Sequence, residues 1–295
     1  MVINICGMFN IQYPIIQGGM GNISNAKLTA AVSEAGGLGT IGCGTMTPNN
    51  VEQLIVDTKK LTNNPFAVNI AINVSPYTEE LVDLVIKHKV PVVSLSAGNP
   101  ASYIARLKEH GIKVLTIVAT IKHAKKAEAA GADAIVAEGF EAAGINSTLE
   151  LTTFTLIPQI VDQVKIPVIA AGGIADGRGL AAAFMLGAAG VQMGTRFIAT
   201  EEAPFHPNYK NAILQASDTS TQIIGRTVGR TRRVIANEYS EKVKQLEAEG
   251  ISIEEFDQLT TESQHIKGAI DGNFTEGFIN GGQISGMIDT IPTVK

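Results

Sequence analysis

The amino-acid sequence predicts an α/β fold, a (β/α)8 TIM barrel with a C-terminal helical appendage or lid. The chain has 295 residues, close to the ~250 that one such barrel needs. Hydrophobic residues make up 45% and charged residues 17%, and 30 glycines are available for tight turns between buried strands. Short apolar runs also alternate with stretches of helical spacing along most of the sequence.

Eight apolar runs rich in Val and Ile are predicted to be the barrel strands. They occupy residues 14–20, 39–44, 66–72, 92–98, 114–120, 134–140, 168–174 and 191–197. Helices are expected between them, at 25–35, 48–60, 78–88, 100–110 and 121–130. A doubly wound open sheet is the alternative, but the even spacing without a long interruption favours a closed barrel.

The regular alternation stops after Phe197. We therefore expect residues 1–200 to form the barrel core with the ligand site, and 201–295 to form a helical lid and C-terminal segment that complete the same domain. The lid contains the basic segment GRTVGRTRR, with Arg226, Arg230, Arg232 and Arg233. These arginines could meet a phosphate or an acidic carrier protein, but a solvated face is the ordinary expectation for a charge run.

Composition and charge exclude several classes of partner. The net charge of -5 and the lack of a dense Lys/Arg block argue against binding to nucleic acid or to an anionic membrane. Cys6 and Cys43 have no metal-ligand spacing, so we expect no metal site, a reducing compartment and a cytoplasmic location. No apolar run could span a bilayer, and MVINICGMFN lacks the features of a signal peptide. Small molecules or proteins are the expected partners, and a homodimer is the expected assembly.

The loops after the seventh and eighth predicted strands are candidates for a phosphate site. The first contains Ala171, Gly172 and Gly173, and the second contains Met193, Gly194 and Thr195. In (β/α)8 barrels the loops at these two places often hold phosphate, and glycine exposes backbone N–H groups to it. A glycine pair alone would indicate only a tight turn, but two such loops in the correct order favour phosphate.

Further residues at strand ends are candidates for contacts with a flat ring. Gly18, Gly19 and Met20 follow the first strand, where missing side chains let a ring pack against the backbone. Asn69 and Glu138 bring polar groups to the ends of the third and sixth strands. Polar side chains in otherwise apolar strands need a partner, and a ligand would supply one.

Several segments resemble one family in order along the chain: PIIQGGM, AGGLGTIG, PFAVNI, SAGNP, GADAIVAEG, IPVIAAGGIADGRG, GVQMGTRF and HPNYK. The sequence is similar to the nitronate monooxygenase (2-nitropropane dioxygenase) family. Its motif wording is closest to the branch of FMN-dependent enoyl-acyl carrier protein reductase II. The resemblance covers about the first two thirds of the chain, and the closing FINGGQISGMI is also similar.

The resemblance implies that FMN is bound by Gly18, Gly19, Met20, Asn69, Glu138, Gly173, Gly194 and Thr195. It also implies one of two reactions. Either NADH or NADPH sends a hydride through FMN to an enoyl thioester, with an acyl carrier protein as a candidate partner, or a nitronate is oxidised with oxygen. We expect the reductase reaction first, the nitronate monooxygenase reaction as the alternative, and a non-catalytic flavin-binding protein third.

One motif departs from the family. Where relatives carry a histidine in a segment like EAGGH, this chain reads EAAGINS, and Asn146 stands in its place. An amide is no base near pH 7, so Asn146 orients a ligand or the proton comes from elsewhere, which argues against nitronate oxidation. His206 and His265 are the histidines that can reach the site; structural roles are expected for both, and His206 is the second catalytic candidate after Asn146.

Two other barrel chemistries are disfavoured. An inosine-monophosphate-dehydrogenase-type reaction needs a cysteine after the sixth strand, and residues 139–153 contain none. A Schiff-base aldolase needs a lysine at the carboxyl end of a strand, and none is expected there.

Overall fold

The computed structural model describes residues 5–295, so the first four residues of the MVINICGMFN segment lie outside it. Eight parallel strands form a barrel, in the order β1-β9-β8-β6-β5-β4-β3-β2. Their bounds are β1 Ile15–Gln17, β2 Gly39–Gly42, β3 Phe66–Ala71, β4 Val92–Ser96, β5 Lys113–Val118, β6 Ala134–Glu138, β8 Val168–Ala171 and β9 Gly190–Met193. The barrel closes between β1 and β2, where Ile16 forms a parallel bridge with Leu38. The predicted fold class is confirmed, and each of the eight predicted runs overlaps a strand.

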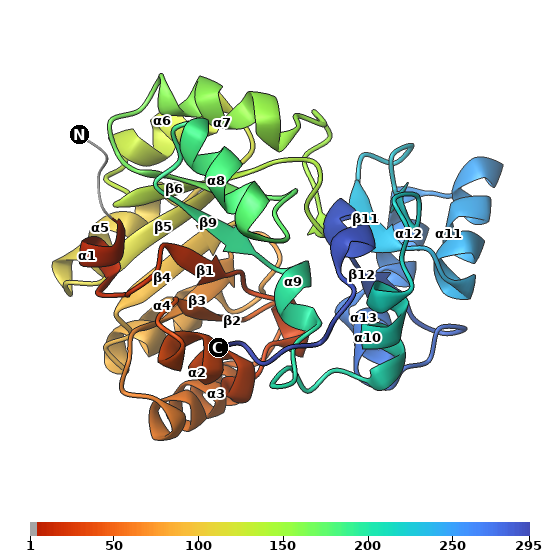
Figure 1. Ribbon diagram of the computed structural model, residues 1–295, viewed down its shortest axis with the longest axis horizontal. Coiled ribbons are helices and arrows are strands. Elements are labelled where there is room, and N and C mark those ends of the chain that lie inside the picture. Colours follow the sequence, from red (N-terminus) through yellow and green to blue (C-terminus); the bar gives the residue numbers. More distant parts are fainter. Residues whose placement is uncertain (1–4) are drawn as a thin grey trace.

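Helices surround the barrel (Figure 1). They are α2 Ala26–Glu34, α3 Pro48–Leu61, α4 Thr78–Lys87, α5 Ala101–Glu109, α6 Ile121–Ala129, α7 Thr153–Val161 and α8 Gly177–Met185, with a short α9 Thr195–Ile198 after the last strand. The largest apolar cluster packs these helices against the outer faces of the strands. A second cluster fills the barrel interior together with Ile5 and Phe9 of α1 (Ile5–Phe9). Because α1 packs against one end of the barrel interior, the opposite end is left for a ligand.

The appended segment lies at the end of the barrel toward which the strand arrows point (Figure 1). Its helices are α10 Pro207–Leu214, α11 Glu238–Glu249, α12 Ile253–Leu259 and α13 Glu262–Ala269, followed by the 3-10 turn η2 Gln283–Met287. It also contains an antiparallel sheet, which the sequence analysis did not predict. In this sheet β11 (Arg232–Ile235) pairs with β10 (Thr221–Ile224), β12 (Ile279–Asn280) and β7 (Gly144–Ile145). Because β7 belongs to the loop after β6, the sheet joins the appended segment to the barrel.

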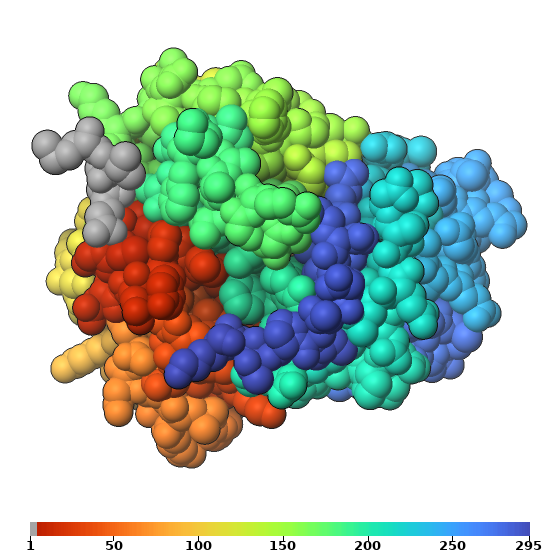
Figure 2. Space-filling model, viewed as in Figure 1, coloured from red at the N-terminus to blue at the C-terminus, as the bar shows by residue number. Residues whose placement is uncertain are grey.

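The C-terminal residues run back over the barrel as a strap, which Figure 2 shows in dark blue across the molecular surface. Arg196 donates to the carbonyl oxygen of Thr290 at 2.9 Å. The carboxylate of Glu202 accepts from the backbone N–H of Val294 at 2.9 Å. These bonds attach the end of the chain to the segment just after β9.

None of the helices within 5–295 combines the length and the apolar character needed to cross a bilayer.

Candidate functional site

A cavity of about 1200 Å³ lies at the carboxyl ends of the barrel strands. It exceeds the ~300–1,000 Å³ of ordinary small-molecule sites, so a cofactor and a substrate could share it. Its lining includes every residue that the sequence predicted for the cofactor: Gly18, Gly19, Met20, Asn69, Glu138, Ala171, Gly172, Gly173, Met193, Gly194 and Thr195. The appended segment supplies part of the wall, including Arg232, Glu262, His265 and Asn280.

The loop after β1 passes very close to β2 and β3. A Cβ atom on Gly19 would lie 2.8 Å from the Cβ of Asn69 and 3.0 Å from the Cα of Gly42. Only glycine fits this crossing without displacing the neighbouring backbone. The buried side chain of Gln17 fixes the start of the loop, because its Oε1 accepts from the backbone N–H of Thr40 at 2.9 Å.

The loops after β8 and β9 place bare backbone at the cavity. Gly172 and Gly173 have φ values of +90° and +74°, the left-handed region that favours glycine. Gly173 makes no hydrogen bond with another residue of the described chain. A Cβ atom on Gly194 would meet no atom within 4 Å, so the space in front of this residue is open.

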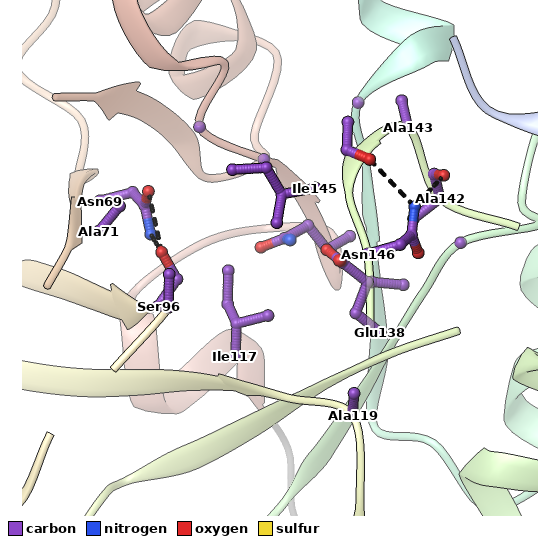
Figure 3. A pocket seen from close by; sticks show the side chains of 18 of the residues that line it. Asn69, Ala71, Ser96, Ile117, Ala119, Glu138, Ala142, Ala143, Ile145 and Asn146 are labelled. Carbon is purple, nitrogen blue, oxygen red and sulfur yellow. Dashed lines mark hydrogen bonds between the residues drawn. The ribbon is translucent and has the colours of Figure 1, made fainter. Parts of the chain in front are cut away.

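Two polar side chains reach the cavity from the strand ends (Figure 3). The Nδ2 of Asn69 donates to the Oγ of Ser96 and to the carbonyl oxygen of Ser94, both at 3.2 Å. Glu138 is the last residue of β6, and burial raises the pKa of its carboxyl to about 7. A carboxyl with this pKa can give or take a proton near neutral pH.

Asn146 lies in the loop after β6, at the position where the sequence resemblance implied a histidine. The Nδ2 of Asn146 donates to the carbonyl oxygens of Ala142 and Gly144, at 2.9 and 3.2 Å. The side-chain amide is therefore hydrogen-bonded within its own loop. Ile145 beside it is 53% exposed and lines the cavity. Asn146, Ile145, Glu138 and Ile117 all line this cavity, and Figure 3 labels the four of them.

The structure places His206 outside the cavity lining. Its Nδ1 accepts from the backbone N–H of Asn208 at 3.1 Å, which caps the N-terminus of α10. His206 therefore has a structural role as a helix cap, and we assign it no catalytic role.

The basic segment is only partly solvated, which corrects the expectation of a solvated face. Arg226 and Arg230 are exposed, whereas Arg232 and Arg233 are 8% and 3% exposed because β11 runs between two other strands. The Nη2 of Arg233 donates to the carbonyl oxygen of Phe140 at 2.9 Å, which links β11 to the loop after β6. The run RRVI, with two β-branched residues after the arginines, was the available signal for a strand.

A buried histidine lies in the wall that the appended segment supplies. His265 is 3% exposed, and its ring stacks on Phe278 with 5.3 Å between ring centroids. Its Nε2 is 3.2 Å from the Nδ2 of Asn280, and its Nδ1 is 3.7 Å from the carboxylate of Glu262. The sequence predicts that His265 can reach the site but gives no signal for its neighbours Phe278 and Asn280. Within residues 5–295, no group of three His, Cys, Asp or Glu side chains is placed to hold a metal ion.

Comparison with known proteins gives consistent similarities. The family model for nitronate monooxygenase matches residues 4–80 and 71–295. A probable nitronate monooxygenase of Staphylococcus saprophyticus is 37% identical, covering 83% of this chain and 81% of the relative. A (3aS,4S,5R,7aS)-5-hydroxy-7a-methyl-1-oxo-octahydro-1H-indene-4-carboxyl-CoA dehydrogenase of Rhodococcus jostii is 34% identical, covering 98% and 91%. The structure of FabK from Thermotoga maritima superposes with a TM-score of 0.94 at 43% identity, covering 98% of this chain and 91% of FabK.

Proposed function

The chain belongs to the nitronate monooxygenase family and is a flavin-dependent oxidoreductase, and we propose that it uses FMN to reduce enoyl thioesters with NADH or NADPH. The observation that carries the proposal is the single cavity in which all the predicted cofactor residues meet. Similarity to FabK, an enoyl-ACP reductase II, and to a dehydrogenase of a carboxyl-CoA compound supports a thioester substrate. Oxidation of nitronates with oxygen is the second candidate, favoured by the relatives named for that reaction.

The residues at the cavity fit FMN. Gly173 offers a backbone N–H that has no partner among the described residues, and open space lies in front of Gly194, as a phosphate group requires. The glycine loop after β1 leaves no side chain between the backbone and a flat ring. We assign the phosphate to the loops after β8 and β9, and the ring and ribityl chain to Gly18–Met20, Asn69 and Glu138.

When bound, FMN would supply reversible acceptance of a hydride. The residues of the chain position the reactants and control water and protons. Asn69 is held by Ser94 and Ser96, so its amide keeps one orientation toward the cavity. Glu138, with a pKa of about 7, can exchange a proton with a group held beside it. Ile117 and Ile145 present apolar surface in the same cavity, which suits an acyl chain.

An anaerobic stopped-flow titration of the FMN-loaded protein tests the proposal. Mixing with NADH or NADPH should bleach the flavin absorbance, and crotonyl-CoA should then restore it. If an alkyl nitronate reduces the flavin while neither nicotinamide does, with oxygen as the oxidant, the second candidate replaces the first.

The location and partners of the enzyme belong to the same proposal. Cys43 is a buried thiol outside any disulfide, which suits a reducing cytoplasm. An acyl carrier protein is the candidate thioester donor and a homodimer the candidate assembly. Exposed apolar residues on α7 and α8, such as Phe154 and Met185, are available for a subunit contact. Light scattering would test the dimer, and a monomeric mass at micromolar concentration would argue against it.

A further inference from the structure

Arg232 is a buried cation whose side chain has no hydrogen-bonding partner among residues 5–295. Its side chain is 8% exposed and lines the large cavity. It packs on the ring of Phe278, with Cζ 4.9 Å from the ring centroid, but it donates no hydrogen bond and forms no salt bridge within residues 5–295. Glu262 and Asp257 attract the charge only through space. A guanidinium with five N–H donors and no protein acceptor needs partners from the cavity that it lines, either water or a ligand.

A second unsatisfied polar atom lies in the same wall. The Oδ1 of Asn280 is buried and has no hydrogen-bond partner among the described residues, while the Nδ2 faces His265 at 3.2 Å. A half-turn of this amide would let the Nε2–H of His265 donate to Oδ1 and would free the Nδ2 to donate into the cavity. Two groups that are unsatisfied in the protein alone would then both be donors to one ligand.

Arg232 and Asn280 both lie against the loop after β6. A Cβ atom on Gly144 would lie 3.7 Å from Cγ of Asn280, so Asn280 touches the loop after β6. Arg232 is paired with Ile145 of that loop in the antiparallel sheet. The appended segment therefore brings its donors to the loop after β6, beside Gly144 and Ile145.

We propose that Arg232 and Asn280, with Asn280 oriented by His265 and Glu262, form a subsite for a substrate oxygen that carries negative charge. The inference rests on the proposed function, because it names the part of the substrate that this wall holds. When a hydride adds to the β-carbon of an enoyl thioester, the alkene electron pair shifts and the carbonyl oxygen takes the charge until the α-carbon gains a proton. A fixed guanidinium near that oxygen stabilises the charge as it develops. A nitronate would place an anionic oxygen at the same donors.

Binding of a carboxylate probe tests the subsite without turnover. Isothermal titration of the FMN-loaded protein compares hexanoate with hexanamide, which has the same length and no charge. The native protein should bind hexanoate more tightly, and Arg232→Gln should weaken hexanoate binding about tenfold or more, as expected for loss of a charged hydrogen bond. Arg230→Gln is the matched control, since Arg230 is exposed in the same basic segment. Equal hexanoate affinity in native protein and Arg232→Gln would overturn the subsite.

Two further measurements keep the test decisive. Asn280→Leu removes the amide and leaves Arg232, so it should weaken hexanoate binding about two- to tenfold even if Arg232→Gln does not fold; unchanged affinity in this variant counts against the subsite. Bleaching of the flavin by NADH or NADPH should be the same in native protein and in the control Arg230→Gln, which lies outside the lining of the large cavity. If no nicotinamide reduces the native flavin while hexanoate binding still depends on Arg232, the subsite stands and the proposed reductase reaction fails.

Discussion

The carboxylate of Glu141 binds the first turn of α7 through Thr153. One oxygen accepts from both the backbone N–H and the hydroxyl of Thr153 at 2.9 Å, and the other accepts from the same N–H at 3.0 Å. The backbone oxygen of Glu141 also accepts from the N–H of Gln283 in η2. A single residue thus ties the loop after β6 to a barrel helix on one side and to the appended segment on the other.

Glu141→Gln should therefore destabilise the protein. The amide can keep one of the bonds to Thr153 but loses the charge, so we expect a loss of about 1–3 kcal/mol in the free energy of unfolding. Urea denaturation measures it. Glu150→Gln is the control, because Glu150 forms an exposed ion pair with Arg226 and should cost only about 0–1 kcal/mol. Equal losses in the two variants would contradict the anchoring role of Glu141.

The barrel and its glycine loops could be predicted from the sequence, but the wall built by the appended segment could not. The strands repeat a local pattern, and loops at parallel strand ends always meet at one face of a barrel. Arg232 and Ile145 are far apart in the chain, and their pairing depends on an antiparallel sheet with strands as short as two residues. Short strands give little periodic signal, so GRTVGRTRR resembled a solvated charge run. The role of His265 was hidden for the same reason, since Asn280 and Phe278 reach it only through tertiary packing.

Cys43 should be chemically inert in the folded protein. Its thiol is fully buried behind the end of β2, and burial raises its pKa far above that of a free thiol. Since the thiolate is the reactive form, iodoacetamide should label Cys43 only after denaturation, whereas the partly exposed Cys6 should be labelled first. Mass spectrometry of the digested protein measures both sites. Rapid native labelling of Cys43 would show that its environment opens in solution.

Gly194→Val should separate flavin binding from folding. The added side chain enters open space in the protein alone, so the thermal midpoint of the flavin-free variant should match that of the native protein. In the presence of FMN the same atoms would occupy the proposed phosphate position. Overpacking of this kind costs ~1–3 kcal/mol, which corresponds to roughly five- to 150-fold weaker binding in a fluorescence titration. Gly177→Val is the control at the exposed start of α8, where a Cβ also meets no atom within 4 Å. Full retention of FMN by Gly194→Val would place the phosphate elsewhere.

Glu138 should make the flavin-free protein less stable as the pH rises. Its pKa is about 7 in the folded protein and 4.5 as a free carboxyl, because burial disfavours the charged form. Below pH 4.5 both states hold the proton and the group has no effect. Between pH 4.5 and 7 the unfolded chain releases the proton while the folded protein keeps it, so stability falls, and it levels off above pH 7. The shift corresponds to a loss of at most about 3 kcal/mol. Glu138→Gln removes the titration, so this variant should match native protein at pH 4 and exceed its urea midpoint at pH 8. Glu254→Gln is the control, because Glu254 is exposed, and it should leave the pH dependence of stability unchanged. If Glu138→Gln instead followed the native pH profile, Glu138 would be solvated in the absence of flavin.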